Sequence, residues 1–243
     1  MLVLAHRGAH LPETPGVREN TLDAFRAAAD CGADGVELDV RRCRDGGLVV
    51  HHDAVLPDGR LVAEAALSEL PVWVPTLSSA LGACAALRLV NVEIKASPFE
   101  AGYELAERLA ADVASVLAGP EGRPAGATLV SSFDLGALNA FAASSAGTPT
   151  GWLTTTGYDQ LDAVTTAAGA GHRMINPPEG AVTADLVAAA HAAGLGVLAW
   201  TVNDAARLGQ MATAGVDVVV TDRPRLAVSA LRRGGGAGRE ASR

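Results

Sequence analysis

The chain has few aromatic residues and few cysteines. Phe, Trp and Tyr make up 4% of its 243 residues, and the cysteines are only three, at Cys31, Cys43 and Cys84. An odd number of widely spaced cysteines argues against a disulfide framework and against the paired thiols of a structural zinc site. It fits a reducing compartment, so we expect a cytoplasmic location.

Positive charge and long apolar runs are also scarce. Lys and Arg number 19 against 27 Asp and Glu, which gives a formal net charge of −8. Nucleic-acid binding needs a basic face, so no nucleic-acid partner is expected, and a phosphate-bearing substrate would need local positive charge. No apolar run is long enough to span a bilayer, and the first residues do not resemble a signal peptide, so we expect no integral membrane segment.

Hydrophobic residues make up 49% of the chain, and they recur as short runs separated by longer Ala- and Leu-rich stretches. Short apolar runs of this kind are typical of buried parallel strands. Eight such strands, each followed by a helix, predict an α/β fold, the TIM (β/α)8 barrel. A doubly wound open sheet is the alternative, but no Gly-rich dinucleotide fingerprint follows the first run. The eight predicted strands are Val3–His6, Val36–Val40, Val90–Ile94, Thr128–Ser132, Thr150–Leu153, Arg173–Asn176, Val197–Thr201 and Asp217–Thr221.

Three of the intervening helices have clear limits. The first is expected over 21–30, where Asn20 can cap its start and Gly32 can end it. Two others, over 185–193 and 205–214, each run up to a glycine that is followed by a predicted strand.

A ninth apolar run, Leu48–Asp53, follows the second strand too closely for a crossover helix. We therefore predict an antiparallel hairpin that turns at Asp45-Gly46 and places His52 opposite Asp39. A register slip of one residue would place His51 there instead.

The chain is expected to form one barrel domain over residues 1–231. Within it, residues 54–74 contain prolines and polar residues and are expected to form a small insertion over the barrel mouth. Residues 232–243, rich in Gly and Arg, are expected to be a disordered tail.

Polar side chains gather at the carboxyl ends of the first three strands, where TIM barrels place their active sites. Glu37 and Asp39 are two residues apart, so both leave the same face of a strand, and Glu93 and Lys95 repeat this spacing. The first strand ends in His6-Arg7-Gly8.

Three carboxylates that converge on a barrel mouth repel one another and need a cation. Hard oxygen ligands favour Mg²⁺, Ca²⁺ or Mn²⁺, so Glu37, Asp39 and Glu93 are the candidate metal ligands. Surface salt bridges at the strand ends are the alternative. The apolar neighbours of these residues favour the metal, because buried charges need partners.

Two histidines and two cations complete the candidate site. An imidazole titrates near neutrality, so His6 and His52 are the candidate proton-transfer groups. Arg7 and Lys95 supply local positive charge for an anion. Arg7 can also pair with Glu19.

As a set, these residues resemble the glycerophosphodiester phosphodiesterase family, and the resemblance extends from Ala5 to about Pro224. The motifs that carry it are His6-Arg7-Gly8, Glu19-Asn20-Thr21, Glu37-Leu38-Asp39, His52-Asp53, Glu93-Ile94-Lys95, Ser132-Phe133, Trp200-Thr201-Val202-Asn203 and Thr221-Asp222.

The resemblance implies a metal-dependent hydrolase that cleaves small glycerophosphodiesters to sn-glycerol 3-phosphate and an alcohol. It implies that the metal ligands are the three carboxylates named above and that His6 and His52 are the general acid and base. It further implies that the attacking group is the 2-hydroxyl of glycerol, which gives a cyclic phosphate that water then opens with the histidines exchanging roles. The remaining roles that it implies are phosphate contacts by Arg7 and Lys95, orientation of the site by Glu19, and a pocket wall of Phe133 and Trp200.

Two other activities are compatible with such a barrel. A phospholipase D-like activity on lysophospholipids or sphingolipids would need an apolar surface near the mouth, for which the candidates are Val55, Leu56, Val72, Trp73 and Val74. An enolase-type proton abstraction would use Lys95 as its base and would leave the histidines without roles. The identity of the metal, the head group and the oligomeric state stay open.

Overall fold

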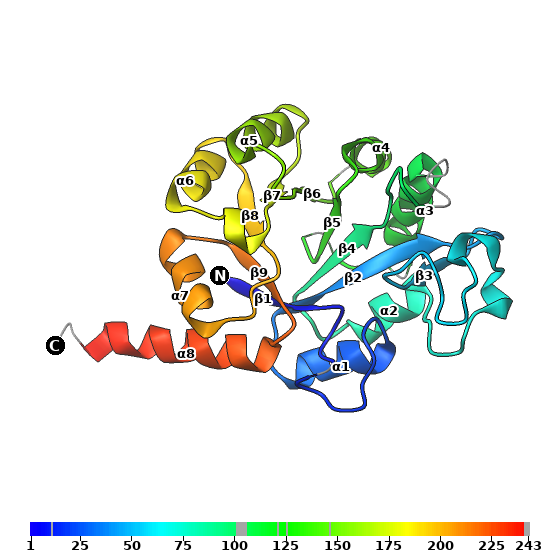
Figure 1. Ribbon diagram of the computed structural model, residues 1–243, viewed down its shortest axis with the longest axis horizontal. Coiled ribbons are helices and arrows are strands. Elements are labelled where there is room, and N and C mark those ends of the chain that lie inside the picture. Colours follow the sequence, from blue (N-terminus) through cyan, green and yellow to red (C-terminus); the bar gives the residue numbers. More distant parts are fainter. Residues whose placement is uncertain (11, 101–105, 121, 125, 146, 241–243) are drawn as a thin grey trace.

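The computed structural model describes residues 1–240 except 11, 101–105, 121, 125 and 146. Eight parallel strands close on themselves with helices around them, so the chain is a TIM barrel, as the sequence predicts (Figure 1). The barrel closes where β1 pairs with both β2 and β9. Its strands are β1 (Leu2–His6), β2 (Gly35–Arg42), β4 (Leu89–Ile94), β5 (Thr128–Ser132), β6 (Thr150–Leu153), β7 (Met174–Asn176), β8 (Gly196–Ala199) and β9 (Val218–Thr221).

The helices lie on the outside of the barrel and cover its strands (Figure 1). Among the described residues, none of them is long and apolar enough to cross a membrane. The α-helices are α1 (Leu22–Asp30), α2 (Leu77–Ala83), α3 (Ala106–Ala118), α4 (Leu135–Ser144), α5 (Gln160–Gly169), α6 (Ala184–Ala192), α7 (Ala205–Ala214) and α8 (Pro224–Glu240). Short 3-10 helices are η1 (Val62–Glu64), η2 (Leu67–Glu69) and η4 (Glu179–Ala181).

Strand alternation separates two sets of side chains. On β2, Val36, Leu38 and Val40 belong to the core between strands and helices, while Glu37 and Asp39 leave the opposite face. A smaller cluster of aliphatic side chains fills part of the barrel interior, and it includes Leu4, Leu129, Leu198, Val218 and Val220. The interior is thus apolar at one end, which leaves the carboxyl ends of the strands for polar groups.

The limits of α6 and α7 agree with the predicted helices, but the predicted cap of α1 is wrong. Thr21, not Asn20, caps this helix, because the Thr21 hydroxyl accepts a hydrogen bond from the Ala24 N–H at 3.3 Å. Asn20 has a left-handed backbone (φ +54°) and turns its side chain toward Asp39 instead. The residue that looks like a cap is therefore part of the polar end of the barrel.

The hairpin forms, but its predicted register is off by one residue. Strand β3 (Leu48–Val50) pairs antiparallel with the end of β2, and His51 N–H donates to the Asp39 carbonyl at 3.0 Å. The loop contains three residues rather than two, because Cys43 N–H bonds to the Gly47 carbonyl and Gly46 takes φ +91°. His51, not His52, therefore lies opposite Asp39.

Residues 54–74 differ from the predicted cover of the barrel mouth. They lie beside β3 at the edge of the barrel (Figure 1), and η1 and η2 fall within them. Their apolar side chains Leu56, Val62 and Val74 pack with Cys43 and Val49 in a small separate core. The outer face of the hairpin therefore supplies the surface that this segment buries.

Helix α8 continues to Glu240, into the predicted tail 232–243, while residues 241–243 lie outside the described residues. Its early apolar residues Leu226, Val228 and Leu231 pack on the barrel. A helix that is already nucleated in this way can propagate into a Gly-rich stretch, at a cost of about 1 kcal/mol per glycine relative to alanine.

The barrel predicts a strict need for glycine at position 35. A Cβ there would lie 1.9 Å from the Leu89 carbonyl oxygen and 2.6 Å from Leu4 Cδ2, between paired strands. Gly35→Ala should lower the free energy of unfolding by about 3 kcal/mol, measured by urea denaturation. Gly209→Ala is the matched control on the exposed face of α7, where a Cβ meets nothing within 4 Å. It should raise stability by about 0.5–1 kcal/mol; equal effects of the two changes would contradict the steric argument.

Candidate active site

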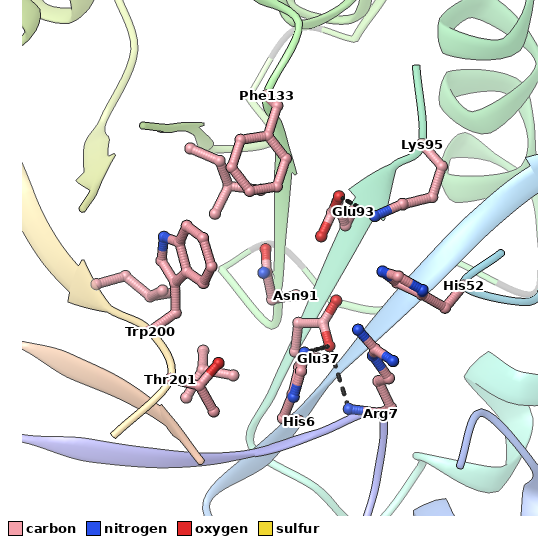
Figure 2. A pocket seen from close by; sticks show the side chains of 13 residues that line it. His6, Arg7, Glu37, His52, Asn91, Glu93, Lys95, Phe133, Trp200 and Thr201 are labelled. Carbon is pink, nitrogen blue, oxygen red and sulfur yellow. Dashed lines mark hydrogen bonds and ion pairs between the residues drawn. The ribbon is translucent and has the colours of Figure 1, made fainter. Parts of the chain in front are cut away.

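A cavity of about 300 Å³ opens at the carboxyl ends of the strands. Figure 2 shows its two halves: charged side chains lie on one side, and Phe133 and Trp200 lie on the other. Its floor includes Leu198 and Val220, which also belong to the interior apolar cluster. The residues that line it are His6, Arg7, Glu37, His52, Asn91, Glu93, Lys95, Phe133, Leu153, Leu198, Trp200, Thr201 and Val220.

The cavity brings together eight of the ten predicted site residues. The other two, Asp39 and Glu19, contact its lining from behind. Asp39 is 1% exposed and lies within ion-pair distance of Lys95 and Arg7. Glu19 Oε1 accepts a hydrogen bond from Arg7 Nη1 at 3.0 Å, which is the pairing that the sequence suggested.

Three carboxylates converge at this end of β2 and β4. Glu37, Asp39 and Glu93 each offer an oxygen, and these oxygens all lie within 4.8 Å of one another. Burial, with the Asp39 charge second, raises the pKa of Glu37 to about 8. Burial also raises the pKa of Glu93. Burial therefore favours the protonated forms of these two carboxyl groups, Glu37 above all.

Asp39 differs from its neighbours because its charge is compensated. Burial acts to raise its pKa, but Lys95, Arg7 and the Asn20 amide outweigh burial and lower it. Lys95 Nζ lies 3.5 Å from Asp39 Oδ1, and Asn20 Nδ2 donates to Asp39 Oδ2 at 2.7 Å. Asp39 is thus held in its ionised form, whereas burial favours the protonated form of Glu37.

The loop after β1 carries these partners in an unusual backbone. Arg7 takes φ +56°, and its N–H donates to Glu37 Oε2 at 3.1 Å while its side chain reaches Glu19 and Asp39. Gly8 follows with φ +83°, where a Cβ would lie 2.6 Å from Ala24 Cβ. Glycine is required at this position because both the backbone angle and the helix contact exclude a side chain.

Both histidines bind a carboxylate through Nδ1. His6 Nδ1 lies 2.6 Å from Asp222 Oδ1, and His52 Nδ1 lies 2.7 Å from Asp53 Oδ1. An ionised carboxylate only accepts, so each Nδ1 carries a proton and each Nε2 is left for a substrate. Although burial opposes it, the His6 hydrogen bond lowers the pKa of Asp222 to about 2. The hydrogen bond with His52 lowers the pKa of Asp53.

The two imidazoles nevertheless have opposite pKa shifts. Burial acts to lower the pKa of His6, but the Asp222 hydrogen bond and the charge of Glu37 raise it overall. Burial lowers the pKa of His52, and the charges of Lys95 and Arg7 add to this effect while Asp39 opposes it. His6 therefore favours the protonated form and His52 the neutral form.

His52 lines the cavity although it does not lie opposite Asp39, because β3 ends at Val50. The strand ladder therefore does not fix His52. The ring of His51 instead packs against Trp73, with their centroids 5.8 Å apart, and His51 is buried.

Four polar residues of the site were given no functional role by the sequence reasoning. Asn20 binds Asp39, Asp222 binds His6, and Asn203 Nδ2 in turn donates to Asp222 Oδ2 at 2.7 Å. Asn91 lines the cavity and is 1% exposed. Position alone could have found two of them: Asn91 continues the two-residue spacing of Glu93 and Lys95, and Asp222 directly follows a strand.

The fold and this site define a class: a TIM-barrel enzyme with an acidic cluster and two carboxylate-bound histidines at the barrel mouth. Residues 6–226 match the model of the glycerophosphoryl diester phosphodiesterase family. The chain belongs to that family, which confirms the resemblance seen in its motifs and the expectation of an enzyme of the phosphodiesterase class.

One relative matches nearly the whole chain, and another matches a short part of it more closely. A glycerophosphodiester phosphodiesterase of Bacillus altitudinis is 30% identical over 93% of this chain and 96% of its own length. One from Caldanaerobacter subterraneus is 54% identical over 52 residues, which are 21% of this chain and 20% of that protein.

Solved structures show the same architecture. A phosphodiesterase of Oleispira antarctica, in complex with the product sn-glycerol-3-phosphate, superposes with a TM-score of 0.84 at 26% identity, over 96% of this chain and 97% of that one. A glycerophosphodiester phosphodiesterase of Thermotoga maritima gives a TM-score of 0.76 at 28% identity, over 94% of this chain and 97% of that one.

The contact between His6 and Asp222 predicts the effect of removing one charge. Asp222→Asn keeps the shape but loses the hydrogen-bonded charge that raises the pKa of His6, so burial should lower that pKa from its wild-type value while Glu37 still acts to raise it. NMR titration of the His6 ring protons measures this. Asp217→Asn is the matched control, because Asp217 Oδ2 pairs with His191 Nε2 at 2.9 Å and does not touch His6. A His6 pKa that is the same in Asp222→Asn as in the wild-type protein would contradict the assigned effect of Asp222 on His6.

Proposed function

We propose that this protein hydrolyses glycerophosphodiesters to sn-glycerol 3-phosphate and an alcohol, with one divalent cation and two histidines. The observation that carries the proposal is the convergence of an acidic cluster, two cationic side chains and two imidazoles on one cavity. The product bound to the Oleispira antarctica homologue supports the glycerol phosphate part.

The three carboxylates fit a divalent cation. Glu37 Oε1 is buried and makes no hydrogen bond among the described residues, and Glu93 Oε1 has only its ion pair with Lys95, at 2.9 Å. Oxygen ligands of this kind suit Mg²⁺, Ca²⁺ or Mn²⁺. With Asp39 they would hold the ion, which when bound supplies Lewis-acid stabilisation of charge on a phosphoryl oxygen.

Arg7 and Lys95 provide the positive charge for the phosphodiester. The guanidinium of Arg7 forms ion pairs with Asp39 and Glu19. Lys95 Nζ lies beside Glu93 and Asp39. Both also line the cavity. They can therefore neutralise an anionic substrate in a protein whose net charge is negative.

The histidines divide the proton transfers by their protonation states. Neutral His52 takes the proton from the attacking hydroxyl, which belongs to water or to C2 of the glycerol. A new P–O bond forms, the bond from phosphorus to the alcohol oxygen breaks, and protonated His6 donates its proton to that oxygen. Attack by water gives glycerol 3-phosphate directly, whereas attack by the C2 hydroxyl gives a cyclic phosphate, which water then opens with the two histidines in exchanged roles. Asp222 and Asp53 hold the two rings in the tautomer that this requires.

Phe133 and Trp200 form the apolar half of the cavity. Their ring centroids are 5.3 Å apart at 85°, an edge-to-face contact, and Trp200 Nε1 donates to the Asn176 carbonyl at 2.8 Å. We expect this rigid wall to shape the space for the non-phosphate part of the substrate.

The two alternative activities fit the structure less well. The neighbouring carboxylates Glu93 and Asp39 outweigh burial and raise the pKa of Lys95, and a protonated ammonium cannot be the base of an enolase-type reaction. Of the residues suggested as a lipid surface, Leu56 and Val74 are buried in the small core beside β3, whereas Val55 and Val72 are exposed. Lysolipid cleavage is therefore left as an outcome of the assay below.

The assay uses glycerophosphocholine and glycerophosphoethanolamine, and it measures release of glycerol 3-phosphate by metal-stripped protein and after addition of Mg²⁺, Ca²⁺ or Mn²⁺. We expect metal-dependent release that falls at least 100-fold in His6→Ala and in Glu37→Ala. Arg42→Met is a control on the same strand, because Arg42 pairs with Asp112 and does not line the cavity. If folded protein releases nothing with any ion, the soluble-diester proposal fails, and choline release from a lysophospholipid would support the lipid alternative.

Proton release by Glu37 predicts a pH dependence of metal binding. Because the pKa of Glu37 is about 8 without a cation, binding must displace a proton below that pH. The apparent affinity for Mn²⁺, measured by calorimetry, should rise about tenfold per pH unit between pH 6 and 7 and level off above pH 8. Glu37→Gln should bind weakly and lose this slope. An affinity that is constant from pH 6 to 9 would contradict the prediction.

A further inference from the structure

Arg41 continues the row of polar residues on β2. It lies two residues beyond Asp39, so its side chain leaves the face of the strand that carries Glu37 and Asp39. It is 5% exposed, which is unusual for an arginine and requires that its donors be satisfied. No role in the site has been assigned to it so far, and it does not line the cavity.

The guanidinium of Arg41 has two partners. Nε and Nη2 both donate to the main-chain carbonyl of His52, at 2.8 and 2.5 Å, and Nη1 donates to Glu100 Oε2 at 2.8 Å. Two donors from one planar group fix both the position and the direction of the carbonyl that they share.

This contact falls where the backbone needs support. The last regular pair of the hairpin is Val40 with Val50, and the His51 N–H bond to Asp39 is the final ladder contact before His52. The Asp53 carboxylate holds the imidazole of His52 through Nδ1, but Asp53 is itself exposed. Arg41 therefore supplies the buried anchor of this segment.

The end of β2 also binds the loop that follows β4 and begins at Lys95. Lys95 N–H donates to the Val40 carbonyl at 3.1 Å, and Glu100 lies five residues farther along that loop. Through Glu100, the guanidinium links the segment that carries His52 to the loop that follows Lys95. The buried side chain of Arg41 thus connects the segment that carries His52 with the loop that follows Lys95.

We propose that Arg41 is a positioning residue, which holds the His52 peptide so that its imidazole meets the substrate in the geometry for proton transfer. The proposal rests on the proposed role of His52. Arg41 does not line the cavity, so we expect it to act through the residues it holds, His52 first among them. A displacement of about 1 Å at a proton-transfer group costs on the order of 100-fold in rate.

The test is a double-mutant cycle with a matched control. Arg41→Met should lower kcat roughly 10- to 100-fold with little change in KM or in metal affinity, and the same change in a His52→Ala background should have almost no further effect. Arg42→Met should leave kcat within about twofold. Arg42 is the matched residue: its side chain is 9% exposed against 6% for Arg41, and its Nε pairs with Asp112 at 2.7 Å from the other face of β2.

Arg41→Lys tests separately the two parallel hydrogen bonds to the His52 carbonyl and the positive charge of the side chain. A lysine can still pair with Glu100 but cannot give two parallel donors to one carbonyl, so we expect partial recovery of kcat relative to Arg41→Met. Glu100→Gln keeps both bonds to His52 and should retain kcat within a few-fold.

A second readout does not depend on activity. The ¹H–¹³C signal of the His52 ring, recorded at one pH, should shift or broaden in Arg41→Met and stay in place in Arg42→Met. An equal loss of kcat with and without His52, or an unmoved His52 signal in folded Arg41→Met, would overturn the proposal. Wild-type protein without activity on any diester would refute the proposed function instead, while the His52 signal would still decide the role of Arg41.

Discussion

The whole polar end of the barrel depends on the burial of three carboxylates on two adjacent strands. Asp39 and Glu93 lie directly opposite each other in the pairing of β2 with β4, and Glu37 is one step below on the same face. Such a group is costly unless each charge has a partner or a proton. The left-handed turns at Arg7 and Asn20 bring the partners of Asp39 from the loop before α1, and Lys95 brings another from the residue directly after β4. Several features that look separate in the sequence therefore serve one electrostatic requirement.

The length of β2 decides which other groups reach this end. The strand continues beyond its last pair with β1, so its free edge is taken by β3, and the hairpin then leaves the ladder at His51 and His52. Residues 54–74 pack against the far side of that hairpin and not over the cavity. The second histidine arrives from a segment that belongs to no strand or helix of the barrel.

The sequence predicts the barrel, all eight of its parallel strands and the convergence of the acidic cluster, because strand alternation and the carboxyl-end rule are local patterns. It does not predict contacts that depend on long-range geometry. Asp222 meets His6 across 216 positions of the chain, and Asn20 resembles a helix cap until the fold shows it bonded to Asp39. The predicted hairpin register is wrong for a different reason. A two-residue and a three-residue loop both fit a segment that contains Asp45 and Gly46, and only the backbone conformation decides between them.

The opposite pKa shifts of the two histidines follow from where each one lies along this charge distribution. Both rings bind an aspartate through Nδ1, so that contact alone cannot distinguish them. His6 also faces Glu37, 3.9 Å away, whereas Lys95 and Arg7 act on His52 with the opposite sign. A cation held by the three carboxylates would offset the charge of Glu37 at His6 and that of Asp39 at His52. The pKa of His6 would then move back toward neutrality, where a general acid both holds its proton and releases it readily. The buried carboxylates that the fold has to compensate would in this way also adjust the acid that the reaction needs.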